Sequence, residues 1–197
     1  MNGSLFPRLH PRHWLKEWQW HYLRQKLAEV ELLVLDVDGV LTDGGLWFDA
    51  DGFVQKRFDV RDGLGIKLLQ ERGLQLALLS GGSGGATECR AKQLGIMHCL
   101  MGIKDKAASL RSLQSQLAIS SSQTAFLGDD LNDLVVRQDV NLLLATADAC
   151  RPLRRQSDAV LQRCGGHGAV RELSERILQA RQQWHQLEAY GWINCND

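Results

Sequence analysis

Three features are missing from this sequence, and each absence argues against a class of protein. The 197 residues include 23 basic and 23 acidic side chains, so the net charge is +0 and neither a nucleic acid nor an anionic membrane is expected as a partner. No apolar run approaches the ~20 residues that a membrane-spanning helix needs. The N-terminus also lacks the apolar core of a signal sequence, so we expect a cytoplasmic protein.

Cysteines with the spacing of a redox or zinc motif are missing as well. No two cysteines are arranged as CxxC and their number is odd, so neither a disulfide framework nor a zinc site is expected. Scattered, reduced thiols fit this usage better. The five cysteines are Cys89, Cys99, Cys150, Cys164 and Cys195.

The composition itself is that of an ordinary globular protein, with 44% hydrophobic and 23% charged residues. The length suits one sizeable domain with a small appendage. We predict a helical addition over residues 1–30, a main domain over residues 31–180, and a helix end with a tail over residues 181–197. Within the addition, we expect an amphipathic helix over about residues 15–30, packed on its own subunit or on a neighbour. Its predicted apolar face consists of Leu15, Trp18, Tyr22, Leu23, Leu27 and Val30.

The main domain opens on a short apolar run, residues 32–35, that leads directly into Asp36 and Asp38. Such a run is typical of a strand buried on both faces of a parallel sheet. Both aspartates should leave the same face at the carboxyl end of the strand, where open α/β sheets bind ligands. Two carboxylates this close repel each other unless one is protonated or a cation lies between them. For this motif alone, a turn capped by the aspartates is the better explanation.

A second apolar run, residues 74–79, ends in the small polar stretch that begins with Ser80, Gly81 and Gly82. A hydroxyl and closely spaced amides at the end of a strand suit an anion, although a Ser/Gly-rich loop is by itself usually only a loop. Further on, Lys104 and Lys106 precede a helix that is expected to end near residue 118. Because a lysine at a helix start opposes the helix dipole, one of the two is expected to serve an anion.

A third run, residues 124–127, is followed within a few positions by Asp129, Asp130 and Asp133. Helix capping explains one or two acidic residues in a first turn. Together with Asp36 and Asp38 at another strand end, these are more carboxylates than capping requires. A hard cation with oxygen ligands, most simply Mg²⁺, would account for them.

The remaining pattern alternates helices and short strands. A β-hairpin over about residues 45–58 is expected around Asp51 and Gly52, as a two-residue turn in which both residues have positive φ. The alternation predicts a Rossmann-like three-layer α/β/α fold with a parallel central sheet, this hairpin as a small insertion and no cap domain. The other expected helices cover residues 62–72, 85–94 and 169–187, and the other expected strands cover residues 98–101, 142–145 and 159–161.

Brought to one edge of a sheet, these groups suit phosphoryl transfer. The carboxylates would hold a dication, the lysine, hydroxyl and amides would hold an oxyanion, and a free carboxylate next to that anion could attack it. Hydrolysis of a phosphate monoester is among the slowest uncatalysed reactions, so a nucleophile, a metal and an acid are all useful.

The motifs DVDGVLTDG, SGG, DK and GDDLND, in this order between residues 32 and 133, resemble the four motifs of the haloacid dehalogenase superfamily. The resemblance implies that Asp36 is the nucleophile and that Asp38 is the general acid, then the base for water. It implies that Ser80 and Lys106 bind phosphate, and we add Thr42 and Gly81 to this group. The residues assigned to Mg²⁺ are Asp36, Asp38 (through its backbone carbonyl), Asp129 and Asp130, supported by Asp133.

A narrower resemblance covers about residues 31–178. The short hairpin, RDGLGI, the TADA stretch and GGHGAVRE are similar to the capless 3-deoxy-D-manno-octulosonate 8-phosphate (KDO 8-phosphate) phosphatase family. This resemblance implies a sugar phosphate as substrate, a role in lipopolysaccharide biosynthesis, and a homotetramer whose neighbouring subunits complete each pocket. It also implies that Arg61, Asp62, Gly63 and the Gly165–Gly168 segment face the substrate.

One position departs from the family pattern, because Gly82 stands where the family usually has an arginine. Either another basic group compensates for the missing guanidinium, or the substrate differs. The alternative substrate is a nine-carbon acid sugar 9-phosphate. Three other hypotheses stay open: a phospho-accepting signalling domain, a non-catalytic scaffold of the same fold, and a phosphatase of broad specificity.

Overall fold

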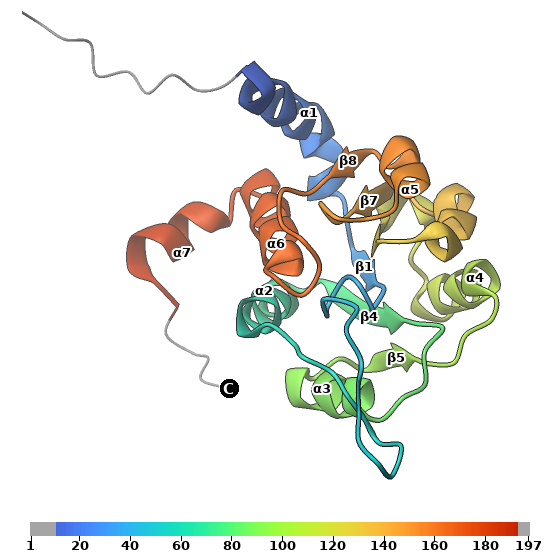
Figure 1. The fold of residues 1–197 in the computed structure, drawn as a ribbon. Coiled ribbons are helices and arrows are strands. Elements are labelled where there is room, and N and C mark those ends of the chain that lie inside the picture. Colours follow the sequence, from blue (N-terminus) through green and yellow to red (C-terminus); the bar gives the residue numbers. More distant parts are fainter. Residues whose placement is uncertain (1–10, 193–197) are drawn as a thin grey trace, which may run out of the picture.

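A six-stranded parallel sheet, in the order β5-β4-β1-β6-β7-β8, forms the centre of the fold (Figure 1). The structure is a computed structural model that describes residues 11–192, with side chains described from residue 18 onward. Residues 1–10 and 193–197, which include Cys195 and parts of the predicted addition and tail, lie outside the described residues. The strands are β1 (Leu32–Leu35), β4 (Gln75–Leu79), β5 (His98–Leu100), β6 (Thr124–Gly128), β7 (Leu142–Ala145) and β8 (Ala159–Val160).

Helices cover both faces of the sheet, and alternate side chains of each strand pack on opposite faces. Leu33 and Leu35 of β1 join the cluster that contains the helices on one side, whereas Leu32 and Val34 join the cluster on the other. The first side holds α1 (Pro11–Ala28), α2 (Val60–Glu71), α3 (Ala86–Leu94) and α6 (Ala169–Ala180). The second holds α4 (Lys106–Leu117), the 3₁₀ helix η2 (Leu131–Asp139) and α5 (Arg151–Gln156). The predicted three-layer α/β/α fold with a parallel sheet is confirmed.

The strand order places a topological switch point at β1. After β1 the chain adds β4 and then β5 on one side, and it returns to pair β6 on the other side of β1. Ligands of open α/β sheets bind outside the carboxyl ends of the strands at such a point. The loops that follow β1, β4 and β6 therefore meet at the predicted site.

The connection from β1 to α2 carries the predicted hairpin, formed by β2 (Trp47–Phe48) and β3 (Val54–Gln55), which extends away from the sheet (Figure 1). Its turn differs from the prediction. Gly52 alone has positive φ, at 83°, and its N–H donates to the carbonyl oxygen of Asp49. The Asp49 carboxylate accepts bonds from the amides of Asp51 and Phe53. These bonds close a three-residue connection, so the two-residue turn was wrong.

Helix α1 packs against α6 of its own subunit, as one of the two expected arrangements, but with a different face. Trp20 is 5% exposed and belongs to the core with Leu23 and Leu27, whereas Trp18 and Tyr22 are 66% and 84% exposed. The predicted inclusion of Trp18 and Tyr22 in the apolar face was therefore wrong. Helix α1 contains several aromatic residues, and the packing against α6 determines which of them are buried.

The last predicted helix, residues 169–187, is divided in two. Helix α6 ends at Ala180, Gln182 has a φ of 60°, and α7 (Trp184–Tyr190) begins beyond it. The break allows the ring of Trp184 to lie 5.5 Å from the Arg171 guanidinium. In one straight helix the Cα atoms of these residues would be about 20 Å apart. Helix α5 was not predicted, because its six residues include four that are polar or charged.

Among the helices between residues 11 and 192, none has both the length and the apolar character needed to span a bilayer. The cysteines described by the structure, which are Cys89, Cys99, Cys150 and Cys164, are free thiols, in agreement with the expectation of scattered cysteines.

Candidate active site

A polar cavity of about 430 Å³ lies at the carboxyl ends of β1, β4 and β6. Each of these three strands is followed directly by polar residues of the cavity wall. Because the strands are adjacent and in parallel register, residues from three distant parts of the sequence meet there. The lining residues are Asp36, Asp38, Ser80, Gly81, Gly82, Asp129, Asp130, Leu131 and Asn132.

Asp36 lies at the centre of the site, directly after β1. It is 5% exposed, and its Oδ1 is 3.0 Å from the Nζ of Lys106, which is itself 3% exposed. The same Nζ lies 2.6 Å from Oδ1 of the fully buried Asp133. Burial and then the charge of Asp133 raise the pKa of Asp36 to about 6, although Lys106 acts in the opposite direction. Lys106 thus joins two buried carboxylates that would otherwise repel each other.

Asp133 supports the loop that carries Asp129. Its second carboxylate oxygen accepts the amides of Asp129, at 2.9 Å, and of Asp130, at 3.3 Å. Asp130 caps its own 3₁₀ helix by accepting the amide of Leu131 at 2.7 Å. A single buried carboxylate therefore ties the end of β6 to the lysine at the start of α4.

Oxygens of Asp36, Asp129 and Asp133 all lie within 4.8 Å of one another, in a group suited to a metal ion. Burial, followed by the charges of Asp36 and Asp133, raises the pKa of Asp129 to about 8. Oxygen ligands crowded at this distance with a net negative charge are what Mg²⁺ binds in proteins. The residues present therefore fit Mg²⁺. Asp133 already accepts three hydrogen bonds, which leaves Asp36 and Asp129 as the carboxylates more available to the ion.

Ser80 and the two glycines after it form a cradle beside Asp36. The Ser80 Oγ accepts the amide of Gly82 at 3.1 Å, so its hydroxyl proton can point elsewhere. The Gly82 carbonyl oxygen accepts the amide of Gly102, and the Ser80 carbonyl oxygen accepts that of Ile103. These bonds tie the loop to the strand end of β5. The predicted phosphate-side residues Ser80 and Gly81 both line the cavity.

Asp38 has a partner that the sequence did not indicate. The Nζ of Lys56, at the end of the hairpin, lies 2.8 Å and 2.9 Å from the two oxygens of Asp38. The side chain of Lys56 is only 5% exposed. A lysine between exposed neighbours on a hairpin gives no sequence signal of such burial.

Five predicted residues lie outside the wall of this cavity: Lys106, which contacts Asp36 from behind the wall, and four others. Thr42 is fully buried, and its hydroxyl bonds the Val37 carbonyl oxygen and the Gly44 amide. Arg61 pairs with Asp59 at 2.7 Å and lines a different polar cavity of about 510 Å³ along α6. The other two are Asp62 and Gly63, which are both buried in α2.

Asp62 has a structural partner in the segment that starts α6. Its two carboxylate oxygens accept the amides of Gly168, at 3.2 Å, and Arg171, at 2.9 Å. Burial raises the pKa of Asp62 to about 6. In this subunit Asp62 therefore connects α2 to α6, and its predicted contact with substrate stays a prediction.

The Gly165–Gly168 segment packs behind the loop after β1. A Cβ on Gly165 would clash with the carbonyl group of Gly39, and the Gly166 amide donates to the Val40 carbonyl oxygen. Gly39 has a φ of 86°, and a Cβ there would meet the Asp129 carboxylate. Glycine at these positions lets the two backbone segments approach each other closely and leaves room for the Asp129 carboxylate.

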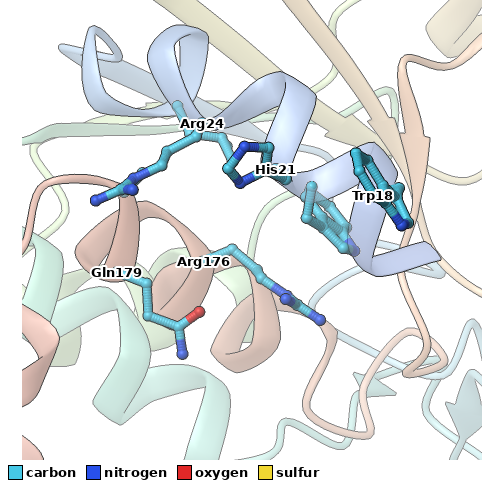
Figure 2. Close-up of a pocket in the computed structure, with 8 residues that line it drawn as sticks. Trp18, His21, Arg24, Arg176 and Gln179 are labelled. Carbon is cyan, nitrogen blue, oxygen red and sulfur yellow. The ribbon is translucent and has the colours of Figure 1, made fainter. Parts of the chain in front are cut away.

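A larger cavity, of about 570 Å³, lies between α1 and α6, away from this chemistry. Figure 2 shows Trp18, His21 and Arg24 of α1 facing Arg176 and Gln179 of α6. We call it the α1–α6 groove. It is lined by Trp18, Trp20, His21, Arg24, Leu27, Arg176, Gln179 and Ala180.

The parallel sheet, with a buried aspartate after its central strand, a lysine beside that aspartate and a carboxylate pair opposite, defines a phosphohydrolase of the haloacid dehalogenase superfamily. Over 159 residues, 81% of its length, the chain is 42% identical to the KDO 8-phosphate phosphatase of Haemophilus influenzae and covers 88% of that protein. The chain belongs to the 3-deoxy-D-manno-octulosonate 8-phosphate phosphatase family.

Solved structures agree with this assignment. The phosphatase of this name from Moraxella catarrhalis, in complex with magnesium, phosphate and KDO, is 37% identical with a TM-score of 0.83, over 86% of this chain and 97% of that one. The cobalt-bound form from Haemophilus influenzae is 42% identical with a TM-score of 0.78, over 80% and 92% of the two chains. No protein-family model matches the sequence.

Proposed function

We propose that this protein is a Mg²⁺-dependent phosphatase that hydrolyses KDO 8-phosphate in lipopolysaccharide biosynthesis. The observation that carries the proposal is the position of Asp36, buried beside Lys106 and Asp129 and lining one cavity with the Ser80–Gly82 cradle. The relative from Moraxella catarrhalis, described with magnesium, phosphate and KDO, supports the metal and the substrate. The family membership supports the enzyme class, a phosphoric monoester hydrolase.

In this mechanism Asp36 is the nucleophile. One of its carboxylate oxygens forms a bond to phosphorus, and the bond from phosphorus to the sugar oxygen breaks. Asp38 gives its proton to the departing alkoxide. Asp38 then takes a proton from the water that hydrolyses the phospho-aspartate, which restores Asp36 and releases phosphate.

The other site residues hold the reacting groups in place. The Ser80 hydroxyl, the Gly81 amide and Lys106 would bind the phosphoryl oxygens. Asp36 and Asp129, with the backbone carbonyl of Asp38 and support from Asp130, would hold Mg²⁺. When bound there, the ion supplies positive charge that offsets the charge of the phosphoryl group and of the carboxylates.

We further propose a homotetramer in which a neighbouring subunit covers the pocket. The hairpin is too short to close over a substrate alone, yet its large side chains are exposed, which is typical of an interaction surface. These side chains are Leu46 (48% exposed), Trp47 (67%), Phe48 (68%) and Phe53 (71%). Light scattering should give four subunits, and Trp47→Ser with Phe48→Ser should reduce that number and also kcat/KM. The cytoplasmic location expected from the sequence remains a prediction.

The function is tested by Mg²⁺-dependent phosphate release from a panel of sugar phosphates, with Asp36→Asn as the control. Selective turnover of KDO 8-phosphate that the substitution abolishes is the expected result. Because Gly82 replaces the arginine usual in the family, the panel includes a nine-carbon acid sugar 9-phosphate. Preference for that compound would keep the mechanism and change the substrate. Absence of turnover on every phosphoester would contradict the proposal.

A further inference from the structure

Lys56 has a buried side chain that the proposed mechanism does not use. It follows β3, its side chain is 5% exposed, and its neighbours Gln55 and Arg57 are exposed. The ammonium contacts both oxygens of Asp38, at 2.8 Å and 2.9 Å. A buried ammonium is costly unless it is paired. Here the Asp38 carboxylate is its partner, and the hairpin thereby places a positive charge in the active site.

The Lys56 ammonium lies close to Gly82 of the cradle. A Cβ built on Gly82 would lie 3.8 Å from the Lys56 Nζ, 3.5 Å from the Ser80 Oγ and 3.0 Å from Asp38 Oδ2. A side chain at position 82 would therefore extend into the space beside the Ser80 hydroxyl and the Lys56 ammonium. Glycine leaves that space open to a ligand.

We propose that Lys56 binds the substrate phosphate, in the space that Gly82 leaves open beside the Ser80 hydroxyl. An ammonium has three donors, and the two oxygens of Asp38 engage at most two of them at once. A phosphate oxygen next to the Ser80 hydroxyl receives the third. The inference rests on the proposed phosphoester site but not on which sugar carries the phosphate.

The arrangement has a consequence for recognition. An arginine on the cradle loop offers a planar, two-pronged contact, whereas a lysine offers a point charge on a flexible stem. In this chain that charge is attached to the hairpin, next to its exposed apolar side chains. Phosphate affinity therefore depends on where the hairpin lies, which a cation on the cradle loop would not require.

The test is the affinity of the full-length protein for inorganic phosphate, measured by calorimetry with saturating Mg²⁺, for a cycle of variants. Lys56→Met should weaken phosphate binding about 10- to 100-fold, the effect of losing one hydrogen bond to a charged group. Adding Gly82→Arg to Lys56→Met should recover most of this loss. Gly82→Arg alone should gain much less than it gains in the Lys56→Met background. Gly82 does not have positive φ, so arginine is compatible with its backbone.

A merely structural role for Lys56, such as holding Asp38, gives a different result. In that case Lys56→Met would lower kcat on p-nitrophenyl phosphate, leave phosphate affinity unchanged and show no rescue by Gly82→Arg; this would overturn the proposal. Lys56→Gln, which also removes the charge, provides the same measurement if the methionine variant does not fold. Lys92→Met, at an exposed position of α3, is the matched control and should bind phosphate like the wild type.

The two proposals fail separately. A wild type that turns over phosphoesters, with unchanged phosphate affinity in Lys56→Met, contradicts only the role of Lys56. A wild type without turnover, but with phosphate binding that requires Lys56, contradicts only the proposed function. A wild type that binds no phosphate contradicts the role of Lys56 as well.

Discussion

A comparison of the active-site cavity with the α1–α6 groove shows that the volume of a cavity does not indicate whether it is a reactive site. The groove is the larger, at about 570 Å³ against about 430 Å³, and it contains two tryptophans. Its charges are cationic, and the Arg176 guanidinium lies 5.1 Å from the ring of Trp20. The smaller cavity instead collects carboxylates from β1 and β6, two of them with strongly raised pKa values.

The difference is one of electrostatic balance. In the groove, helix α1 is held to α6 by ordinary burial and by a cation above an aromatic ring, which is favourable without any ligand. In the active site, Asp36, Asp129 and Asp133 repel one another, and Lys106 is a cation that lies between Asp36 and Asp133. Groups that are unfavourable without a ligand are more typical of a functional site than an open volume.

The largest expected effect comes from removing the cation that joins the carboxylates. Lys106→Met leaves Asp36 and Asp133 buried and unpaired, which should cost about 3–5 kcal/mol of stability. It should also lower kcat/KM by on the order of 10²–10³-fold, as expected when one donor to a developing charge is lost. Thermal unfolding and steady-state kinetics measure both quantities.

The matched control is Lys104→Met, two residues earlier and exposed. It should change neither stability nor kcat/KM appreciably. A loss of kcat/KM in Lys104→Met but not in Lys106→Met would mean that the sequence alternative, in which Lys104 serves the anion, is the correct one.

The next effect separates stability from catalysis. Trp20→Ala removes a side chain that is 5% exposed and belongs to the core, at a cost of about 3 kcal/mol or more. For a chain of this size the melting temperature should fall by roughly 6–12 °C. The rate well below that temperature should stay within about twofold of the wild type. A large loss of kcat/KM in the folded variant would show that the groove and the active site are coupled.

The pH dependence of the metal-free protein tests the electrostatic difference directly. Because the pKa values of Asp36 and Asp129 are raised to about 6 and about 8, their protonated forms are favoured in the folded state. The stabilising contribution is complete below about pH 4, near the unfolded value, and is lost as pH rises through 6 and then 8. The unfolding free energy of the metal-free protein should therefore fall between pH 5 and pH 8.

Mg²⁺ should reverse that loss, since it binds the deprotonated carboxylates. At a hundredfold excess over Kd the gain is about 2.7 kcal/mol, or roughly 5–10 °C in melting temperature, and it should be smaller at pH 5 than at pH 8. Asp129→Asn should remove most of the gain. A gain from Mg²⁺ that does not depend on pH would contradict this account of the cluster.

The parts of the site that could be predicted from the sequence are those encoded locally. An apolar run that ends in polar residues marks a buried strand and its carboxyl end, and this pattern located Asp36, Ser80 and Asp129. A charge that opposes a helix start left Lys104 and Lys106 as alternatives, and the family resemblance selected Lys106. The structure brings Asp36, Ser80 and Asp129 together because β1 pairs with both β4 and β6, and Lys106 contacts Asp36 from the start of α4.

The parts that were missed depend on which elements pack together. The sequence around Lys56 is that of an ordinary exposed hairpin lysine, and only the folded structure places its side chain against Asp38. Trp18 and Trp20 are equally apolar, and only contact with α6 decides which one is buried. No glycine or proline at the break near Gln182 indicates in the sequence that the helix ends there. In the structure, the break accompanies the packing of the Trp184 ring on the Arg171 guanidinium.

The smallest expected effect is at the rim of the groove. Trp18 is 66% exposed, and its only ring partner in the described chain is His21, whose ring centre lies 6.4 Å away. Trp18→Ala should therefore change stability by about 0.5 kcal/mol or less and leave kcat/KM unchanged. Denaturant unfolding of the two proteins side by side resolves a difference of this size. A loss several times larger would mean that a second copy of the chain covers this tryptophan, and repeating the measurement across protein concentrations would reveal it, because only a contact between subunits depends on concentration.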